Sequence, residues 1–179
     1  ELARKIMREL LESVDVLIGN EEDASDVLDI HPQQVDVHAG KLDFSAYVEV
    51  AQTVSRQFPR IKHIAFTLRE SISASHNNWG ALLYDTATQE HFVSPRVQGT
   101  YAPYEIRQII DRVGGGDSFS AGLIYACTDS SLQTDLQQVL DYATAASCLC
   151  HSIHGDIKYS SADEIRLLMR GNASGRVVR

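Results

Sequence analysis

Three consecutive glycines followed at once by an acid, Gly114-Gly115-Gly116-Asp117, form the segment best suited to chemistry. A helix of small residues is predicted to follow over 117–130. The first amides of a helix lack intrahelical partners and, with the helix dipole, favour an anion such as phosphate. Glycines let the backbone approach that anion because they carry no Cβ. Asp117 is then either a plain N-cap or a general base beside a bound phosphoryl group.

Other glycine motifs that bind phosphates or activate nucleophiles are absent from the sequence. No G-x-x-x-x-G-K-[ST] occurs, which excludes a P-loop. A dinucleotide-binding G-x-G-x-x-G that starts at Gly114 would need glycine where Phe119 stands. No G-x-S-x-G nucleophile elbow occurs. On chemistry alone, the glycine run is an anion-binding turn or a structural turn, and both stay open.

Alternating strands and helices must position this turn. The residue pattern predicts helices over 2–13, 21–30, 43–58, 117–130, 132–153 and 161–171, the last one with a Ser-x-x-Glu capping box. It predicts strands over 14–20 and 62–68, and a strand, Asn-rich turn, strand, turn and strand over 70–94. Segments 31–43, 95–108 and 154–160 are predicted to be loops or connections. This alternation indicates an α/β fold with a largely parallel sheet, whose ligands bind at the carboxyl ends of the strands.

The composition is typical of an ordinary globular protein, with 44% hydrophobic and 22% charged residues in 179. Sixteen basic and 24 acidic residues give a net charge of −8, which disfavours nucleic acids and anionic membranes as partners. No apolar run approaches the roughly 20 residues of a membrane span, and we expect no signal peptide. Cys127, Cys148 and Cys150 lie in apolar helical patterns and are predicted to be core residues of a cytoplasmic protein.

The segment "DRVGGGDSFSAGLIYA" resembles the second signature of the PfkB/ribokinase family of sugar kinases, D-T-x-G-A-G-D-x-F. The matching residues are Asp111, Gly114, Gly116, Asp117 and Phe119. Arg112 and Gly115 depart from the commonest letters and resemble the version of 2-keto-3-deoxygluconate (KDG) kinases. "LIGNEED" resembles the family's N-x-x-E segment, and "AFTLRESISASHNNWGALLYD" resembles its strand-end threonine and ATP-side hairpin. The resemblance covers nearly the whole chain, but only the C-terminal half of the family's chain.

This resemblance implies a ribokinase-like three-layer α/β fold, with 1–179 as a single nucleotide-binding and catalytic portion. It implies an ATP-dependent kinase that converts KDG to its 6-phosphate with Mg²⁺ and, in some members, a monovalent cation. The alternatives are a fructokinase or ribokinase, or a non-catalytic nucleotide-binding domain. The N-terminal half of the family supplies most sugar contacts and the lid through which homodimers form. Since the sequence starts inside a helical pattern without Met, we expect it to be part of a longer gene product.

The resemblance also assigns catalytic and metal-binding roles to individual residues. It makes Asp117 the base that takes a proton from the sugar hydroxyl, and Gly114, Gly115 and Gly116 the anion hole for the phosphoryl group. The Mg²⁺ residues that it implies are Asn20, Glu22 and Asp23, where Asp23 replaces the family's glutamate and Glu22 could substitute for it. A solvated acidic helix start is the alternative for these three residues.

The nucleotide-binding residues implied by the resemblance come from three places. Thr67 and Arg69 follow a buried strand near the nucleotide phosphates, although Arg69 could be an ordinary surface arginine. The residues that border the adenine, or simply allow tight helix packing, are Ala143, Thr144 and Ser147. Gly155 and Asp156 match a late loop that binds a monovalent cation or nucleotide in some members, with a simple turn as the alternative.

Overall fold

The computed structural model describes residues 1–31 and 44–171, so all but the first residue of the loop predicted over 31–43 lies outside the described residues. The chain divides into two compact units. The first contains Glu1–Leu68 and Leu82–Phe92, and the second contains Arg69–Ala81 and Val93–Arg179. The main sheet has the strand order β1-β2-β3-β4, with β7 also paired to β3.

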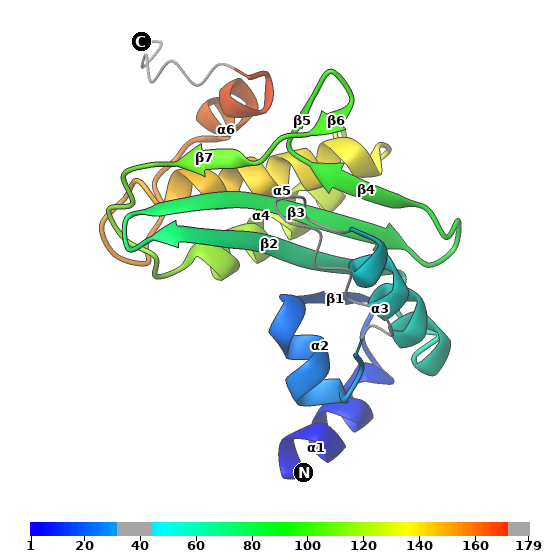
Figure 1. The fold of residues 1–179 in the computed structure, drawn as a ribbon. Coiled ribbons are helices and arrows are strands. Elements are labelled where there is room, and N and C mark those ends of the chain that lie inside the picture. The colour runs from blue at the N-terminus through cyan, green and yellow to red at the C-terminus, as the bar shows by residue number, and fades with distance from the viewer. Residues whose placement is uncertain (32–43, 172–179) are drawn as a thin grey trace. The chain divides into compact units, whose positions relative to one another are not determined.

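The first unit contains α1 (Leu2–Leu11), β1 (Val16–Gly19), α2 (Glu21–Leu28) and α3 (Phe44–Gln57). Strand β1 pairs in parallel with β2 (His63–Ser73), so that Gly19 lies opposite Phe66. Helix α1 packs against α2, which contacts β1 (Figure 1). Arg8 of α1 donates hydrogen bonds to Leu28 O at 2.7 Å and to Gln57 Oε1 at 2.9 Å. One guanidinium therefore ties α1 to the ends of α2 and α3.

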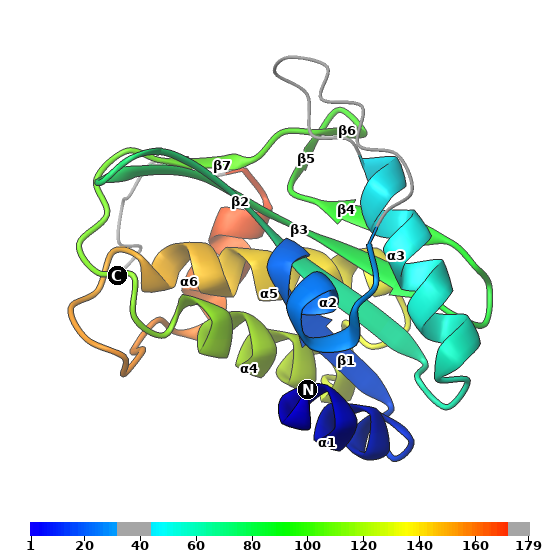
Figure 2. The ribbon, with the colours of Figure 1, turned by 60° about the horizontal axis from the view of Figure 1, so that its bottom comes forward.

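The second unit holds the helices α4 (Gly115–Thr128), α5 (Leu136–Cys150) and α6 (Ala162–Met169). Helix α4 packs against α5, and α5 packs against α6. Figures 1 and 2 show α4 and α5 side by side on one face of the strands. The short strands β5 (Arg96–Val97), β6 (Thr100–Tyr101) and β7 (Tyr104–Ile106) lie in this unit. Strand β3 (His76–Asp85) starts in this unit and ends in the first, whereas β4 (His91–Ser94) starts in the first unit and ends in this one. Because β3 and β7 pair antiparallel, the sheet is mixed and only its first strands are parallel.

Several predicted element bounds were wrong. The hairpin after β2 turns at residues 74–75, whereas the asparagines predicted to form the turn lie inside β3. The connection predicted over 95–108 contains the short pair β5–β6, which turns at Gly99 with a φ of 81°, and the edge strand β7. Helix α5 begins at Leu136 instead of 132, because the Asp135 side chain caps it by accepting hydrogen bonds from two backbone amides.

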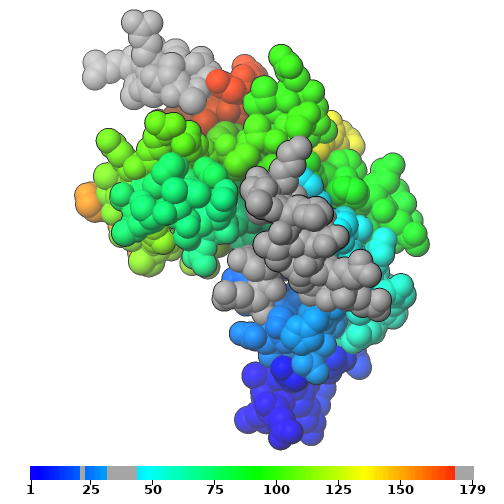
Figure 3. Space-filling model, viewed as in Figure 1, coloured from blue at the N-terminus to red at the C-terminus, as the bar shows by residue number. Residues whose placement is uncertain are grey.

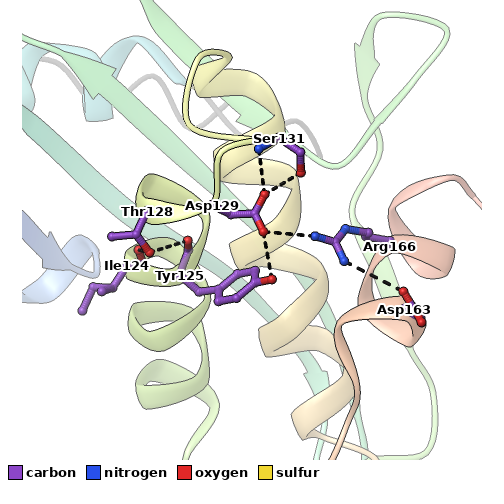
Figure 4. A network of polar contacts seen from close by, with 7 residues as sticks. All are labelled: Ile124, Tyr125, Thr128, Asp129, Ser131, Asp163 and Arg166. Carbon is purple, nitrogen blue, oxygen red and sulfur yellow. Dashed lines mark hydrogen bonds and ion pairs between the residues drawn. The ribbon is translucent and has the colours of Figure 1, made fainter.

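A polar network holds α6 beside the other two helices of the second unit (Figure 4). Asp129 accepts hydrogen bonds from Tyr125 Oη at 2.9 Å and from the Ser131 amide at 2.9 Å, and it contacts Arg166 Nη2 at 3.3 Å. The guanidinium of Arg166 lies 6.0 Å from the centre of the Tyr142 ring. The Ser-x-x-Glu capping box predicted for this last helix is confirmed, with Ser161 as its N-cap.

The cysteines and the helix lengths test the predictions of buried thiols and of no membrane-spanning helix. Cys127, Cys148 and Cys150 are free thiols, as expected for a chain without a disulfide framework. Cys150 is buried as predicted, while the other two are half-buried. Among the helices within residues 1–31 and 44–171, none combines the length and apolar character needed to cross a membrane.

Candidate functional site

The glycine run forms the start of helix α4 in the second unit. The helix begins at Gly115, and Gly114 is its N-cap with a left-handed φ of 80°, a conformation that glycine adopts without strain. A Cβ on Gly114 would stand 3.3 Å from the Asp156 Cα atom, so the loop after α5 closes against the turn. Asp117 therefore lies within the first turn of α4. The plain N-cap alternative for Asp117 is wrong, because Gly114 occupies that position.

Asp117 and the amides next to it are open to a ligand. The Asp117 side chain is exposed, and no hydrogen bond or ion pair holds its carboxylate among the described residues. The Ser118 amide bonds to Gly114 O at 2.8 Å, but the Gly116 and Asp117 amides have no acceptor in the same described part of the chain. A Cβ on Gly116 would meet nothing within 4 Å. These donors and this open space suit an anion at the helix start.

Asp111 fastens the late loop to the glycine run. Its Oδ1 atom accepts a hydrogen bond from the Val113 amide at 3.0 Å, and its Oδ2 atom accepts one from the Gly155 amide at 2.9 Å. Gly155 has a φ of 79°, which explains the glycine at this position. The amide hydrogen bonds, first that of Val113 and then that of Gly155, hold the pKa of Asp111 below its ordinary value.

The substitution Asp111→Asn tests this link through the pH dependence of stability. A carboxyl whose folded-state pKa lies below its unfolded value adds stability above the unfolded pKa, and that stability disappears as the pH falls through the folded pKa. We therefore expect Asp111→Asn to lower the denaturation midpoint in urea at pH 7. The difference in urea midpoint between the variant and the unaltered protein should narrow steadily between about pH 4 and pH 2, the range below the ordinary aspartate pKa. A difference in midpoint that stays constant across that pH range would contradict the prediction.

Arg112 ties the same turn to the β2–β3 hairpin. Its Nη2 atom donates to Ser73 O at 3.1 Å, to Ala74 O at 2.7 Å and to Asn77 Oδ1 at 3.3 Å. Sequence reasoning noted Arg112 only as a departure from the signature. Its acceptors are mostly backbone carbonyls on a distant hairpin, which leave no local pattern in the sequence.

Arg69 lies on the part of β2 that belongs to the second unit. The strand is exposed from Arg69 to Ser73, and its teal-green side chains form part of the face in Figure 3. Burial lowers the pKa of His151, and the positive charges of Arg112 and Arg69 lower it further. Arg69 is therefore close enough to the C-terminal end of α5 to act on its electrostatics. Its predicted phosphate contact stays a prediction.

The small residues of α5 are buried inside the second unit. Ala143, Thr144 and Ser147 each have an exposed fraction of 0%. The Thr144 hydroxyl donates to Leu140 O of its own helix at 2.7 Å, while the Ser147 hydroxyl donates to Gly115 O of α4 at 2.7 Å. This burial favours the alternative of tight helix packing for these side chains. Their contact with adenine stays a prediction.

The predicted Mg²⁺ residues lie in the first unit, where α2 follows β1. The Asp23 amide donates to Asn20 Oδ1 at 3.0 Å, and the Asn20 amide donates to Asp23 Oδ2 at 2.8 Å. This reciprocal pair caps α2, which agrees with the helix-start alternative. Gly19 pairs in register with Phe66, so Asn20 follows the end of β1 beside Thr67 of β2. The predicted strand end at Thr67 is wrong, because β2 continues to Ser73. The side chain of Glu22 lies outside the described residues.

These oxygen atoms fit a magnesium ion that is held through water. Mg²⁺ prefers oxygen ligands and keeps several of its waters, so an amide and a carboxylate at a strand end are suitable partners. One oxygen of each residue already accepts a backbone amide, which leaves indirect contact as the natural mode. No group of three or more His, Cys, Asp and Glu side chains in the described part of the chain could enclose a metal alone.

Comparisons with known proteins give matches among solved structures only: no protein-family model and no curated protein matches the chain. The 2-dehydro-3-deoxygluconokinase of Thermotoga maritima is 39% identical with a TM-score of 0.78, over 95% of this chain and 45% of that chain. A PfkB family carbohydrate kinase from Listeria grayi is 28% identical with a TM-score of 0.74, over 94% of this chain and 45% of that chain. The chain matches the C-terminal half of the PfkB-family carbohydrate kinases.

The predicted family and the predicted ribokinase-like α/β fold are thereby confirmed. The chain spans less than half the length of the kinases that it matches. An aminoimidazole riboside kinase from Salmonella enterica, solved with aminoimidazole riboside and an ATP analogue, is 17% identical with a TM-score of 0.56. The match covers 93% of this chain and 46% of that kinase, and at this identity it supports the fold alone.

Proposed function

We propose that the protein is an ATP-dependent sugar kinase that phosphorylates KDG, also called 2-dehydro-3-deoxygluconate, at its 6-hydroxyl. The observation that carries this proposal is the 39% identity to a 2-dehydro-3-deoxygluconokinase over 95% of the chain. The glycine turn supports it independently, because an exposed carboxylate beside two amide donors without acceptors suits transfer of an anionic group.

Asp117 is the proposed general base. The sugar hydroxyl oxygen bonds to the γ-phosphorus while the bond from that phosphorus to the β,γ-bridging oxygen breaks, and Asp117 takes the hydroxyl proton. The Gly116 and Asp117 amides then donate to the transferring phosphoryl oxygens, with Gly114 and Gly115 shaping the turn. ATP supplies the phosphoryl group, and Mg²⁺ when bound would neutralise charge on its phosphates.

The remaining predicted residues have binding roles in this proposal. Asn20 and Asp23, together with Glu22, would hold Mg²⁺ through its water molecules. Thr67 and Arg69 would contact the nucleotide phosphates, since the guanidinium fork of Arg69 matches phosphate geometry. Residues for the adenine side and the late loop are Ala143, Thr144, Gly155 and Asp156. The Gly155 amide already donates to Asp111.

The family likeness also carries proposals on assembly and location. We propose a cytoplasmic enzyme whose homodimer forms through the lid half of the family's chain. Two rival functions remain distinct from the main one. A fructokinase or ribokinase would keep the same chemistry with another sugar, and a non-catalytic domain would bind ATP without phosphoryl transfer.

The test is ADP release by the full gene product with MgATP and KDG, with fructose and ribose in parallel. Turnover with KDG alone is the expected result. Turnover with another sugar would replace the substrate while keeping the mechanism. No turnover with any of the three, together with saturable ATP binding, would favour the non-catalytic nucleotide-binding domain.

A further inference from the structure

Ser147 makes a hydrogen bond that ordinary helix chemistry does not require. A serine or threonine inside a helix commonly donates to a carbonyl one turn back in its own helix, as Thr144 does to Leu140 O. Ser147, on the next turn of α5, donates instead to Gly115 O of α4 at 2.7 Å, and both residues are buried. The bond therefore joins the core of α5 directly to the glycine turn.

This bond fixes the orientation of one peptide unit in the turn. In a planar trans peptide, the carbonyl of one residue and the amide of the next point in opposite directions. Because the Gly115 carbonyl accepts the Ser147 hydroxyl, the Gly116 amide points away from that hydroxyl. That amide has no acceptor among the described residues, and the space at Gly116 is open. The serine hydroxyl thus aims an amide donor at the proposed phosphate position.

His151 supports the same peptide from the end of α5. A Cβ on Gly115 would stand 3.2 Å from His151 Cε1, so the imidazole lies directly against this glycine. The ring is fixed by the hydrogen bond of Nδ1 with Ser147 O at 2.9 Å and by the Trp79 ring, whose centre is 4.8 Å away. Burial lowers the pKa of His151, which favours the neutral form of the ring against Gly115.

We propose that Ser147 is a positioning residue for phosphoryl transfer, whose hydroxyl holds the Gly115–Gly116 peptide so that the Gly116 amide donates to the transferring phosphoryl group. The inference rests on the proposed kinase function. It assigns Ser147 a task at the phosphoryl end of the site, apart from the adenine contact suggested by the sequence. A bond that matters mainly in the transition state changes kcat more than KM.

The test compares Ser147→Ala with Ser147→Cys and the control Ser152→Ala in the full gene product. Ser152 follows the C-cap of α5, and its hydroxyl donates to Leu149 O at the end of that helix. We expect Ser147→Ala to lower kcat about tenfold, as for a lost hydrogen bond of ordinary strength. KM for ATP and sugar should stay within about twofold of the unaltered values. Ser147→Cys should recover part of the loss, because a thiol is a weak donor of similar size.

A second readout separates positioning from simple loss of stability. Magnesium, ADP and aluminium fluoride together mimic the transferring phosphoryl group, whereas ADP alone does not. In Ser147→Ala the affinity for the mimic should fall about as much as kcat, while the affinity for ADP stays the same. A variant that merely unfolds more easily would leave this ratio of affinities unchanged.

The outcomes are distinct for the two proposals. Suppose that the unaltered protein is active and that Ser147→Ala and Ser152→Ala have the same kcat and the same ratio of mimic to ADP affinity. This result would overturn the role of Ser147 and leave the kinase proposal intact. An unaltered protein that transfers phosphate to none of the sugars would overturn the proposed function, and the positioning role would fall with it.

Discussion

Asp117→Asn should bind ATP as tightly as the unaltered protein while its turnover falls by about 10³-fold, within the range that a positioned general base contributes. The change is nearly isosteric, and no described residue bonds to the carboxylate, so the turn has no reason to rearrange. An amide cannot take the hydroxyl proton, whereas it leaves the glycine amides free to contact phosphate. The measurements are ADP release with saturating MgATP and sugar, and ATP binding by titration calorimetry.

The matched control is Asp163→Asn, which removes the same charge from an exposed acid in the first turn of α6. Its turnover should equal that of the unaltered protein. If Asp117→Asn kept near-normal turnover, Asp117 would not be the base. If both variants lost activity alike, the effect would come from net charge and not from proton transfer.

At the glycine turn, the local sequence predicted the segment and the family but not the start of the helix. The unusual Gly114-Gly115-Gly116-Asp117 run identified the segment, and the signature around it identified the family. The helix start was still misplaced, because glycine is a poor helix former and two of these glycines were assigned to the loop. The left-handed cap at Gly114 and the bond from the Ser118 amide to Gly114 O begin the helix earlier.

Contacts between distant segments escaped the sequence analysis. Helix α5 is buried on most of its surface, so its small residues show no apolar stripe that would separate a ligand-facing side from a packed one. The link from Ser147 to Gly115 and that from Arg112 to the hairpin both end on backbone carbonyls. Any residue can supply a carbonyl, and therefore no sequence pattern predicts these partners.

At the start of α2, sequence analysis was limited for a different reason, because one residue pattern allowed two interpretations. An asparagine followed three residues later by an acid is typical of a capping box, and it is also the family's metal-linked segment. The structure contains the reciprocal cap between Asn20 and Asp23. Capping leaves the second carboxylate oxygen of Asp23 available, so it is compatible with a magnesium ion held through water.

Gly122→Ala should lower the free energy of unfolding by about 2 kcal/mol, the usual cost of overpacking a tight interface. Alanine in place of glycine normally strengthens a helix by about 1 kcal/mol. Here the added Cβ would stand 2.9 Å from Ala146 Cβ and 3.0 Å from Ala143 Cα, closer than carbon atoms can pack. Since Ala143 Cα belongs to the backbone, helices α4 and α5 must separate to admit the methyl group. Urea denaturation of the purified variant measures the loss.

Gly116→Ala is the matched control, because it makes the same change in the same helix where a Cβ would meet nothing within 4 Å. Its stability should equal or exceed that of the unaltered protein, while its turnover should fall because the methyl group occupies the proposed phosphoryl position. An unchanged stability in Gly122→Ala would contradict the close approach of α4 and α5. Normal turnover in Gly116→Ala would contradict the anion hole. The pair therefore separates a glycine needed for helix packing from one needed for the ligand.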